Sequence, residues 1–319
     1  MTRPTKKQLV SWAGTVLMIV SLVFLAQWLY THRVYMVALT SASVIIGLVF
    51  VALFEGFGIL LAGLNFRALV KNVSGVLVHR PLALVVYTVS NLYKYIPGGV
   101  MYVVGRNRLA VETEELSHPE VALSTVIEGA LVAVAAVVIV IITVFDHARE
   151  YLRQEGLPTS LALILIVAVV LSGSAVFSFR HKIMTGLRKL FEHMQVLRPL
   201  VIVKRFGFAL MLMTLWGGTF LATLVVLGQE MSPGFAPTVI GLFLFAWLAG
   251  FLTPGAPSGL GVREVIIMMF MGGILNEDVL MPAIIIHRVV AAAGDVAVYG
   301  VAVAYAHIAK MSKRNVIAN

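Results

Sequence analysis

The chain has 319 residues, of which 60% are hydrophobic and only 12% are charged, and its mean hydropathy is +0.97. A soluble domain of this size carries roughly twice that charged fraction, so the composition excludes a soluble or secreted protein. The net charge of +9 indicates basic residues flanking apolar spans rather than nucleic-acid binding. Because cysteine is absent, disulfides, thiolate metal sites and cysteine nucleophiles are excluded as well.

Six apolar stretches are long enough to be full transmembrane helices, because about 18 or more apolar residues are needed to cross a hydrocarbon core of about 30 Å. In chain order they lie at about 9–30, 36–62, 119–144, 159–179, 206–228 and 279–308. No signal-peptide cleavage pattern follows the first stretch, so we expect a retained helix. No linker or low-complexity segment marks a domain boundary. The sequence therefore predicts an all-α, polytopic protein that forms a single integral membrane domain over residues 1–319.

Two further apolar regions, 81–105 and 237–275, are interrupted by proline and glycine and are predicted to be re-entrant helical hairpins. In the second region, the two arms are about 16 and 14 residues long, which is short for a full span. Nonhelical backbone persists at membrane depth only where protein or a water-filled cavity covers it, so both turns are expected to line a cavity. The predicted turn residues are Pro97, Gly98 and Gly99 in the first hairpin, and Pro254, Gly255, Pro257, Gly259 and Gly261 in the second.

Lysine and arginine predict the orientation, since cytoplasmic loops carry an excess of them. The N-terminal tail and the basic segment 180–205 should both be cytoplasmic, which the parity of the spans allows only if 81–105 enters and leaves on one side. That topology puts most of the 24 basic residues in the cytoplasm, with only Arg33, Arg149 and Arg153 outside. It also makes both ends of the chain cytoplasmic.

The basic segment 180–205 has apolar residues at helical spacing among its charges, such as Leu187, Leu190 and Phe191. This pattern favours an interfacial amphipathic helix that lies on the anionic bilayer surface. Docking of a partner protein on the same segment is the alternative.

The two predicted hairpins resemble each other, which indicates an inverted-topology repeat. Each turn leads to a glycine and then to an arginine. Glu128 follows Pro97 by 31 residues. Arg288 follows Pro257 by the same number. In transporters, such repeats with paired segments broken by glycine and proline place the substrate site near the middle of the membrane. Two unrelated hairpins are the alternative.

Charged side chains inside predicted membrane segments are unfavourable, at about 2.5–3.5 kcal/mol for a central Arg, Lys or Asp. They therefore either pair with one another or bind a ligand. For Glu55 and Asp295, pairing that holds hairpins to spans is favoured, and a coupling role is the alternative. A substrate-binding role is predicted for Lys94, Arg106, Glu128, Arg263, Glu264 and Arg288.

Arg263 adjoins the N-terminus of the second arm of the second hairpin. Free backbone N–H groups there, the helix dipole and the guanidinium all favour an anion such as phosphate. Glu128 could bind a cationic or hydroxylated headgroup, or it could relay a proton. Lys94 lies three residues before Pro97, so it could hold an anion or extend toward a lipid headgroup.

Enzyme signatures are absent from the sequence. It contains no G-x-S-x-G elbow, no H-E-x-x-H pair and no acidic cluster with metal-ligand spacing. We therefore expect a protein that is not an enzyme and that needs no cofactor and no metal.

The segments NLYKYIPGGVMYVVGR (91–106) and TPGAPSGLGVRE (253–264) resemble the membrane region of lysylphosphatidylglycerol synthases and of their stand-alone, flippase-like relatives. That family has a Pro-Gly segment after an early span. It also has a late P-x-G-x-G-x-R-E type segment, followed by a helix that carries an arginine, here Arg288. The resemblance covers roughly residues 10 to 310, and the late segment is its most specific part.

The resemblance implies lipid translocation across a bacterial or archaeal cytoplasmic membrane. The implied substrate is a phospholipid or a polyprenyl-phosphate-linked sugar, held between the two hairpins. Because the sequence ends at Asn319, soon after the last span, it is not expected to synthesise the lipid as the bifunctional relatives do. The alternative is a non-transporting scaffold for a lipid-modifying enzyme, and a homo-oligomer is compatible with either function.

Overall fold

The computed structural model describes residues 41–95, 101–113, 116–154, 198–253 and 257–317. Within these ranges every regular element is a helix. By length and composition, four of the helices could cross a membrane: Ala42–Ser74, His118–Val144, Pro199–Val226 and Glu277–Ala309. The described part of the chain is therefore all-helical and has the several apolar helices of a multi-pass membrane protein.

Four of the six predicted spans correspond to helices, and each of these helices is longer than its predicted span. They are α2 (Ala42–Ser74), α5 (His118–Gln154), α7 (Pro199–Val226) and α10 (Glu277–Ile317). The reason is that hydropathy marks the end of the apolar stretch, whereas a helix continues until its backbone hydrogen bonds are capped. In α2, this cap is Gly75, which has a φ of 77° and donates its N–H to the carbonyl oxygen of Lys71. The predicted spans at 9–30 and 159–179, and the predicted basic helix up to residue 197, lie outside the described residues.

Four shorter helices form two pairs, at the places where hairpins are predicted. In the first pair, α3 (Arg80–Leu92) continues into the 3-10 turn η2 (Tyr93–Tyr95) and packs against α4 (Met101–Thr113). In the second, α8 (Ala236–Leu252) packs against α9 (Val262–Met271), with the 3-10 turn η3 (Pro257–Gly259) between them. A helix of 13 residues such as α3 is about 20 Å long, which is shorter than a bilayer core of about 30 Å.

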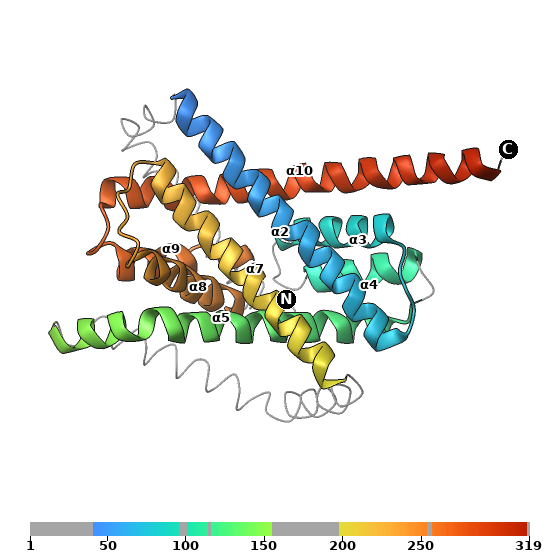
Figure 1. Cartoon of the computed structure of the whole chain (residues 1–319), viewed down its shortest axis with the longest axis horizontal. Coiled ribbons are helices and arrows are strands. Elements are labelled where there is room, and N and C mark those ends of the chain that lie inside the picture. Colours follow the sequence, from blue (N-terminus) through green and yellow to red (C-terminus); the bar gives the residue numbers. More distant parts are fainter. Residues whose placement is uncertain (1–40, 96–100, 114–115, 155–197, 254–256, 318–319) are drawn as a thin grey trace, which may run out of the picture.

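Each pair of short helices connects two long helices along the chain. The first pair connects the end of α2 to the start of α5, and the second connects the end of α7 to the start of α10 (Figure 1). Helices α2 and α7 pack against each other, and both also contact α5 and α10. The two 3-10 turns η2 and η3 contact each other as well, so the two breaks in helical structure meet inside the protein.

Helices α2 and α10 approach each other closely because glycines face each other where they cross. A Cβ atom at Gly294 would lie 2.5 Å from the carbonyl oxygen of Ala52, and one at Gly56 would lie 2.9 Å from the carbonyl oxygen of Gly294. Small residues at such crossings are typical of helix packing in membranes. This crossing brings the middle of α2 against the part of α10 that carries Asp295.

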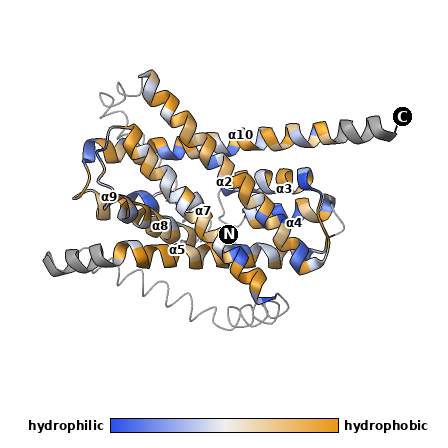
Figure 2. Cartoon of the chain, in the orientation of Figure 1, coloured by the Kyte–Doolittle hydropathy of each residue, from blue (hydrophilic) through white to orange (hydrophobic). Residues whose placement is uncertain are grey.

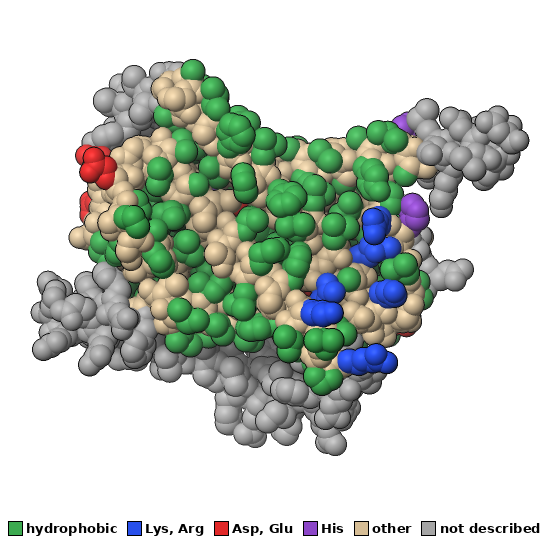
Figure 3. Space-filling view, in the orientation of Figure 1, with side chains coloured by type: hydrophobic (Ala, Val, Ile, Leu, Met, Phe, Trp, Pro, Cys, Tyr) green, Lys and Arg blue, Asp and Glu red, His purple; other side chains and the backbone are tan. Residues whose placement is uncertain are grey.

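The outer surface of the described helices is apolar along its length and charged at its ends. Most of the helix ribbon in Figure 2 has the colour of hydrophobic residues, and on the face drawn in Figure 3 Lys and Arg gather at one end and Asp and Glu at the opposite end. The exposed basic residues come from the end of α2, from α3 and α4, and from the start of α7: Lys71, Arg80, Arg108, Arg198 and Lys204. Exposed acidic residues before α8 and at the start of α10 are Glu230, Glu277 and Asp278.

Candidate functional site

Eight charged side chains lie where the two pairs of short helices and their turns pack with α2, α5 and α10, and we refer to them as the internal charges. Four are basic and four are acidic: Lys94, Arg106, Arg263, Arg288, Glu55, Glu128, Glu264 and Asp295. Three pairs form among them, and each joins a short helix or turn to a long helix. Two internal charges, one of each sign, are left over.

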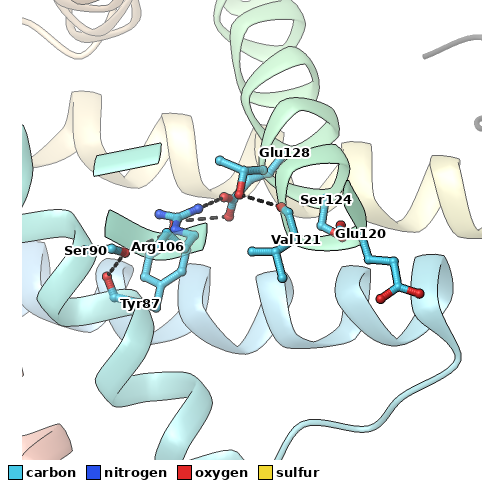
Figure 4. A network of polar contacts seen from close by, with 8 residues as sticks. Tyr87, Ser90, Arg106, Glu120, Val121, Ser124 and Glu128 are labelled. Carbon is cyan, nitrogen blue, oxygen red and sulfur yellow. Dashed lines mark hydrogen bonds and ion pairs between the residues drawn. The ribbon is translucent and has the colours of Figure 1, made fainter. Parts of the chain in front are cut away.

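The first pair joins Arg106 of α4 to Glu128 of α5 at 2.5 Å, with side chains that are only 4% and 9% exposed (Figure 4). The Arg106 Nε also donates to the hydroxyl oxygen of Ser90 at 3.1 Å. Tyr87 donates its hydroxyl to the other Glu128 oxygen at 3.1 Å, and the guanidinium lies over the Tyr87 and Phe66 rings at 4.1 and 4.7 Å. Both charges are therefore fully engaged within the protein.

The second pair joins Lys94 of η2 to Asp295 of α10 at 2.6 Å. The Asp295 side chain is fully buried and also accepts hydrogen bonds from the Asn91 amide at 2.8 Å and the Tyr95 hydroxyl at 2.6 Å. Three donors from the first turn region thus converge on a single carboxylate. This contact fixes the first turn to α10.

The third pair joins Arg288 of α10 to Glu264 of α9, with its Nη2 and Nε at 2.6 and 2.7 Å from the same carboxylate oxygen. The other Glu264 oxygen accepts the backbone N–H of Gly261 at 2.7 Å and so caps the N-terminus of α9. Arg288 also donates to the carbonyl oxygens of Ser258 at 2.9 Å and Gly259 at 3.4 Å. Arg288 therefore holds the second turn, whose Ser258 and Gly259 have φ values of 50° and 69°.

The first and third pairs correspond to each other with their charges exchanged. In each, the second short helix of a hairpin is joined to the long helix that follows it. The base lies on the short helix in the Arg106–Glu128 pair, and the acid lies there in the Glu264–Arg288 pair. Arg288 and Glu128 are the two residues that share the spacing of 31 from their prolines.

Arg263 is the basic residue left over. Its Nε is buried and has no hydrogen-bond partner, and its guanidinium carbon lies 4.9 Å from the centre of the Phe243 ring. No ion pair to it is found among the described residues. Its side chain runs between two glycines, since a Cβ at Gly250 would lie 2.8 Å from the Arg263 Cγ and one at Gly259 would lie 3.2 Å from its Cδ.

Glu55 of α2 is the acidic residue left over. It is 9% exposed, and within the described residues no Lys, Arg or His nitrogen lies within ion-pair distance of it. Its hydrogen bond comes from the hydroxyl of Thr219 on α7, at 2.8 Å. The charged groups that interact with it electrostatically are Lys94, Asp295 and Arg263.

Most of the residues singled out from the sequence thus lie around the two turns that meet. Lys94, Arg263, Glu264 and Arg288 are on or beside these turns together with Asp295, whereas Arg106 and Glu128 form a separate buried pair between α4 and α5. The turn residues 97–99 and 254–256 lie outside the described residues, so the expected cavity at the turns stays a prediction. Among the described residues, no three His, Asp or Glu side chains gather as a metal site requires.

Sequence reasoning missed the uncharged partners of these charges. They are Tyr87, Ser90, Asn91, Tyr95, Thr219 and the Ser258 carbonyl. Asn91 carried a usable signal, because an amide inside an otherwise apolar segment needs a partner. The tyrosines carried none, because an aromatic residue in a membrane helix is as readily explained by packing.

Comparison with protein-family models finds no match for this chain, and comparison with curated proteins finds none either.

Proposed function

We propose that this protein is a lipid flippase or transporter, which moves an anionic phospholipid or a lipid-linked sugar across the cytoplasmic membrane between two re-entrant hairpins. The observation that carries the proposal is the half-buried Arg263, which has no ion-pair partner among the described residues. Three of the four internal basic residues are matched with acids at 2.5–2.6 Å, and Arg263 is the exception. The bound headgroup supplies the missing anion.

A guanidinium in this position needs an anionic or polar partner. Burying a charge without compensation is strongly unfavourable, and an arginine does not lose its proton to avoid the penalty. The Gly261 N–H at the start of α9 is already occupied by Glu264, whereas the Arg263 Nε has no acceptor among the described residues and can bind a headgroup. A phosphate accepts two parallel hydrogen bonds from one guanidinium, which makes it a suitable ligand.

The re-entrant hairpins are supported by the lengths and connections of the short helices. Helices α3 and α4 connect two long helices at one end of the protein, and α8 and α9 connect two at the other end (Figure 1). The exchanged charges of the Arg106–Glu128 and Glu264–Arg288 pairs support an inverted repeat. Transporters of this kind bind their substrate where paired broken helices meet.

The resemblance to lysylphosphatidylglycerol synthase membrane regions and flippase-like proteins points to the same function and to lipid as the substrate class. The alternative is a non-transporting scaffold that recruits an envelope-lipid enzyme. The exposed basic residues at one end, such as Arg80 and Lys204, favour such a contact or an anionic bilayer surface. A scaffold, however, has no need of an uncompensated arginine in its interior.

Replacing Arg263 by methionine should slow lipid flipping by about ten-fold or more, because a hydrogen bond to a charged group contributes about 1.5–3 kcal/mol. The measurement uses proteoliposomes with a fluorescent anionic phospholipid and, in parallel, a polyprenyl-phosphate sugar. The control is Arg108→Met, because Arg108 is an exposed basic residue paired with Glu112 on the surface. It should flip lipid at the native rate.

The Arg263→Met variant should also be about as stable as the native protein, since it removes a half-buried charge that has no acidic partner among the described residues. Loss of flipping would then not be a folding defect. Native flipping rates in Arg263→Met would contradict the site at the second turn. If the native protein inserts into the proteoliposomes but moves neither lipid, the result favours the scaffold function.

The predicted orientation can be tested by labelling, because the chain has no cysteine of its own. Ser117→Cys, at the start of α5, should react with an impermeant maleimide only in inside-out vesicles. Ser232→Cys, before α8, should react only in right-side-out cells. Both serines are exposed. The physical reason is the excess of basic residues at the Ser117 end. The opposite labelling pattern would invert the proposed topology.

A further inference from the structure

We infer that Glu55 is a proton-binding site within the membrane, and that protonation there is coupled to substrate binding at Arg263. The coupling rests on the proposed function, whereas the proton site stands on the geometry of Glu55 alone. In each transport cycle, a proton leaves the water on one side of the membrane and forms an O–H bond with the Glu55 carboxylate. It is later released to water on the other side, and no electrons are transferred.

Glu55 differs from the other three internal acids in what surrounds it. Glu128, Glu264 and Asp295 each have a basic nitrogen within 2.6 Å. Glu55 has the Thr219 hydroxyl instead. In a low-dielectric interior, a carboxylate without a basic partner is neutralised most readily by taking up a proton.

Thr219 can serve both protonation states of Glu55. Its hydroxyl oxygen lies 2.8 Å from the Glu55 carboxylate and 2.7 Å from the carbonyl oxygen of Trp216 on its own helix. A hydroxyl has one hydrogen and two lone pairs, so it donates to only one of these oxygens at a time. When Glu55 is ionised, Thr219 donates to it. When Glu55 is protonated, its O–H donates to Thr219, which then donates to Trp216.

The charged and titratable groups that interact electrostatically with Glu55 come from three other elements. They are Lys94 and Tyr95 of η2, Arg263 of α9, and Asp295 of α10. Lys94 and Tyr95 are both bonded to Asp295 at 2.6 Å, so their contacts are already used. Arg263 is the one group in this set that lacks a polar partner among the described residues.

The electrostatic link between Arg263 and Glu55 sets the direction of the coupling. While no headgroup is bound to Arg263, its positive charge favours the ionised form of Glu55. An anionic headgroup bound to Arg263 cancels that charge and favours the protonated form. Headgroup binding and proton uptake therefore promote each other, as reciprocal linkage requires. One negative charge on the headgroup and one proton then move together, so that no net charge crosses the apolar core.

The proton site is tested by infrared difference spectroscopy on the full chain in lipid. Spectra are compared between about pH 5 and 9, a range in which a buried carboxyl group can change its protonation state. The native protein should show the carbonyl stretch of a buried protonated carboxylic acid that disappears at alkaline pH. Glu55→Gln should lack this band and Thr219→Val should shift its frequency. Glu277→Gln, which changes an exposed acid, should retain it. An unchanged band in Glu55→Gln would overturn the proton site.

The coupling is tested with the same proteins in proteoliposomes that carry a pH gradient. Native flipping of the anionic phospholipid should accelerate with the gradient, and Glu55→Gln should lose this acceleration while Glu55→Asp, which keeps a titratable carboxyl, retains part of it. A Glu55→Gln variant with native gradient dependence would overturn the coupling. If the band disappears in Glu55→Gln but the native protein moves no lipid, the proton site is upheld and it is the proposed flippase function that fails.

Discussion

Replacing Glu128 by glutamine should destabilise the protein by about 3–5 kcal/mol, because removal of one member of a buried ion pair leaves the other charge uncompensated. Arg106 would keep its charge although its side chain is only 4% exposed. Its remaining contacts would be uncharged: the Ser90 hydroxyl and the aromatic rings that lie against the guanidinium. The glutamine is nearly the same size as the glutamate, so the loss measures charge rather than packing. Equilibrium unfolding in mixed detergent micelles gives the free-energy difference directly.

Two further variants separate this explanation from a general sensitivity to mutation. The double variant Arg106→Met with Glu128→Met removes both charges and should recover most of the lost stability, since apolar replacement of a whole buried pair is often neutral. Glu112→Gln breaks the exposed pair with Arg108 and should change stability by less than about 1 kcal/mol. A Glu128→Gln variant as stable as the native protein would show that the buried pair contributes nothing.

Replacing Asp295 by asparagine should loosen the first turn from α10 and abolish lipid flipping. The Asp295 carboxylate accepts from Lys94, Asn91 and Tyr95, and an asparagine would present an NH₂ group to one of these donors and leave Lys94 without an anion. We expect a loss of about 3 kcal/mol or more in the free energy of unfolding, as for other broken buried pairs. Amide hydrogen exchange at residues 93–95 should rise together with this loss.

The matched control for Asp295 removes the lysine at the same time. Lys94→Met combined with Asp295→Asn no longer leaves an unpaired charge, so it should regain stability relative to Asp295→Asn alone. Flipping should not return with it, because the ion pair between Lys94 and Asp295 no longer holds the first turn to α10. Native exchange at residues 93–95 in Asp295→Asn would mean that this carboxylate does not anchor the turn.

The site can be predicted from the sequence only in part, because the positions of charges along the chain do not show which of them pair. Counting charges along the chain identifies Glu55, Arg263 and Asp295 as internal but not which of them are paired. The partners of Asp295 lie 200 or more residues away in the sequence, on the first turn and at the end of α3. The sequence predicts that Glu128 and Arg288 bind substrate, and that role stays a prediction. The structure joins each to the second short helix of its own hairpin, where they hold helices together.

The sequence by itself determined the class of protein, the positions of the four described long helices and the places where helical structure breaks. These are local properties, because apolar length sets a span and proline with glycine sets a break. Only the tertiary structure decided which acid faces which base and which two charges have no oppositely charged partner among the described residues. Pairing depends on how α2, α7 and α10 cross and on which face of each helix a side chain occupies. The glycine contact between Gly56 and Gly294, for instance, fixes a crossing that no stretch of either helix encodes alone.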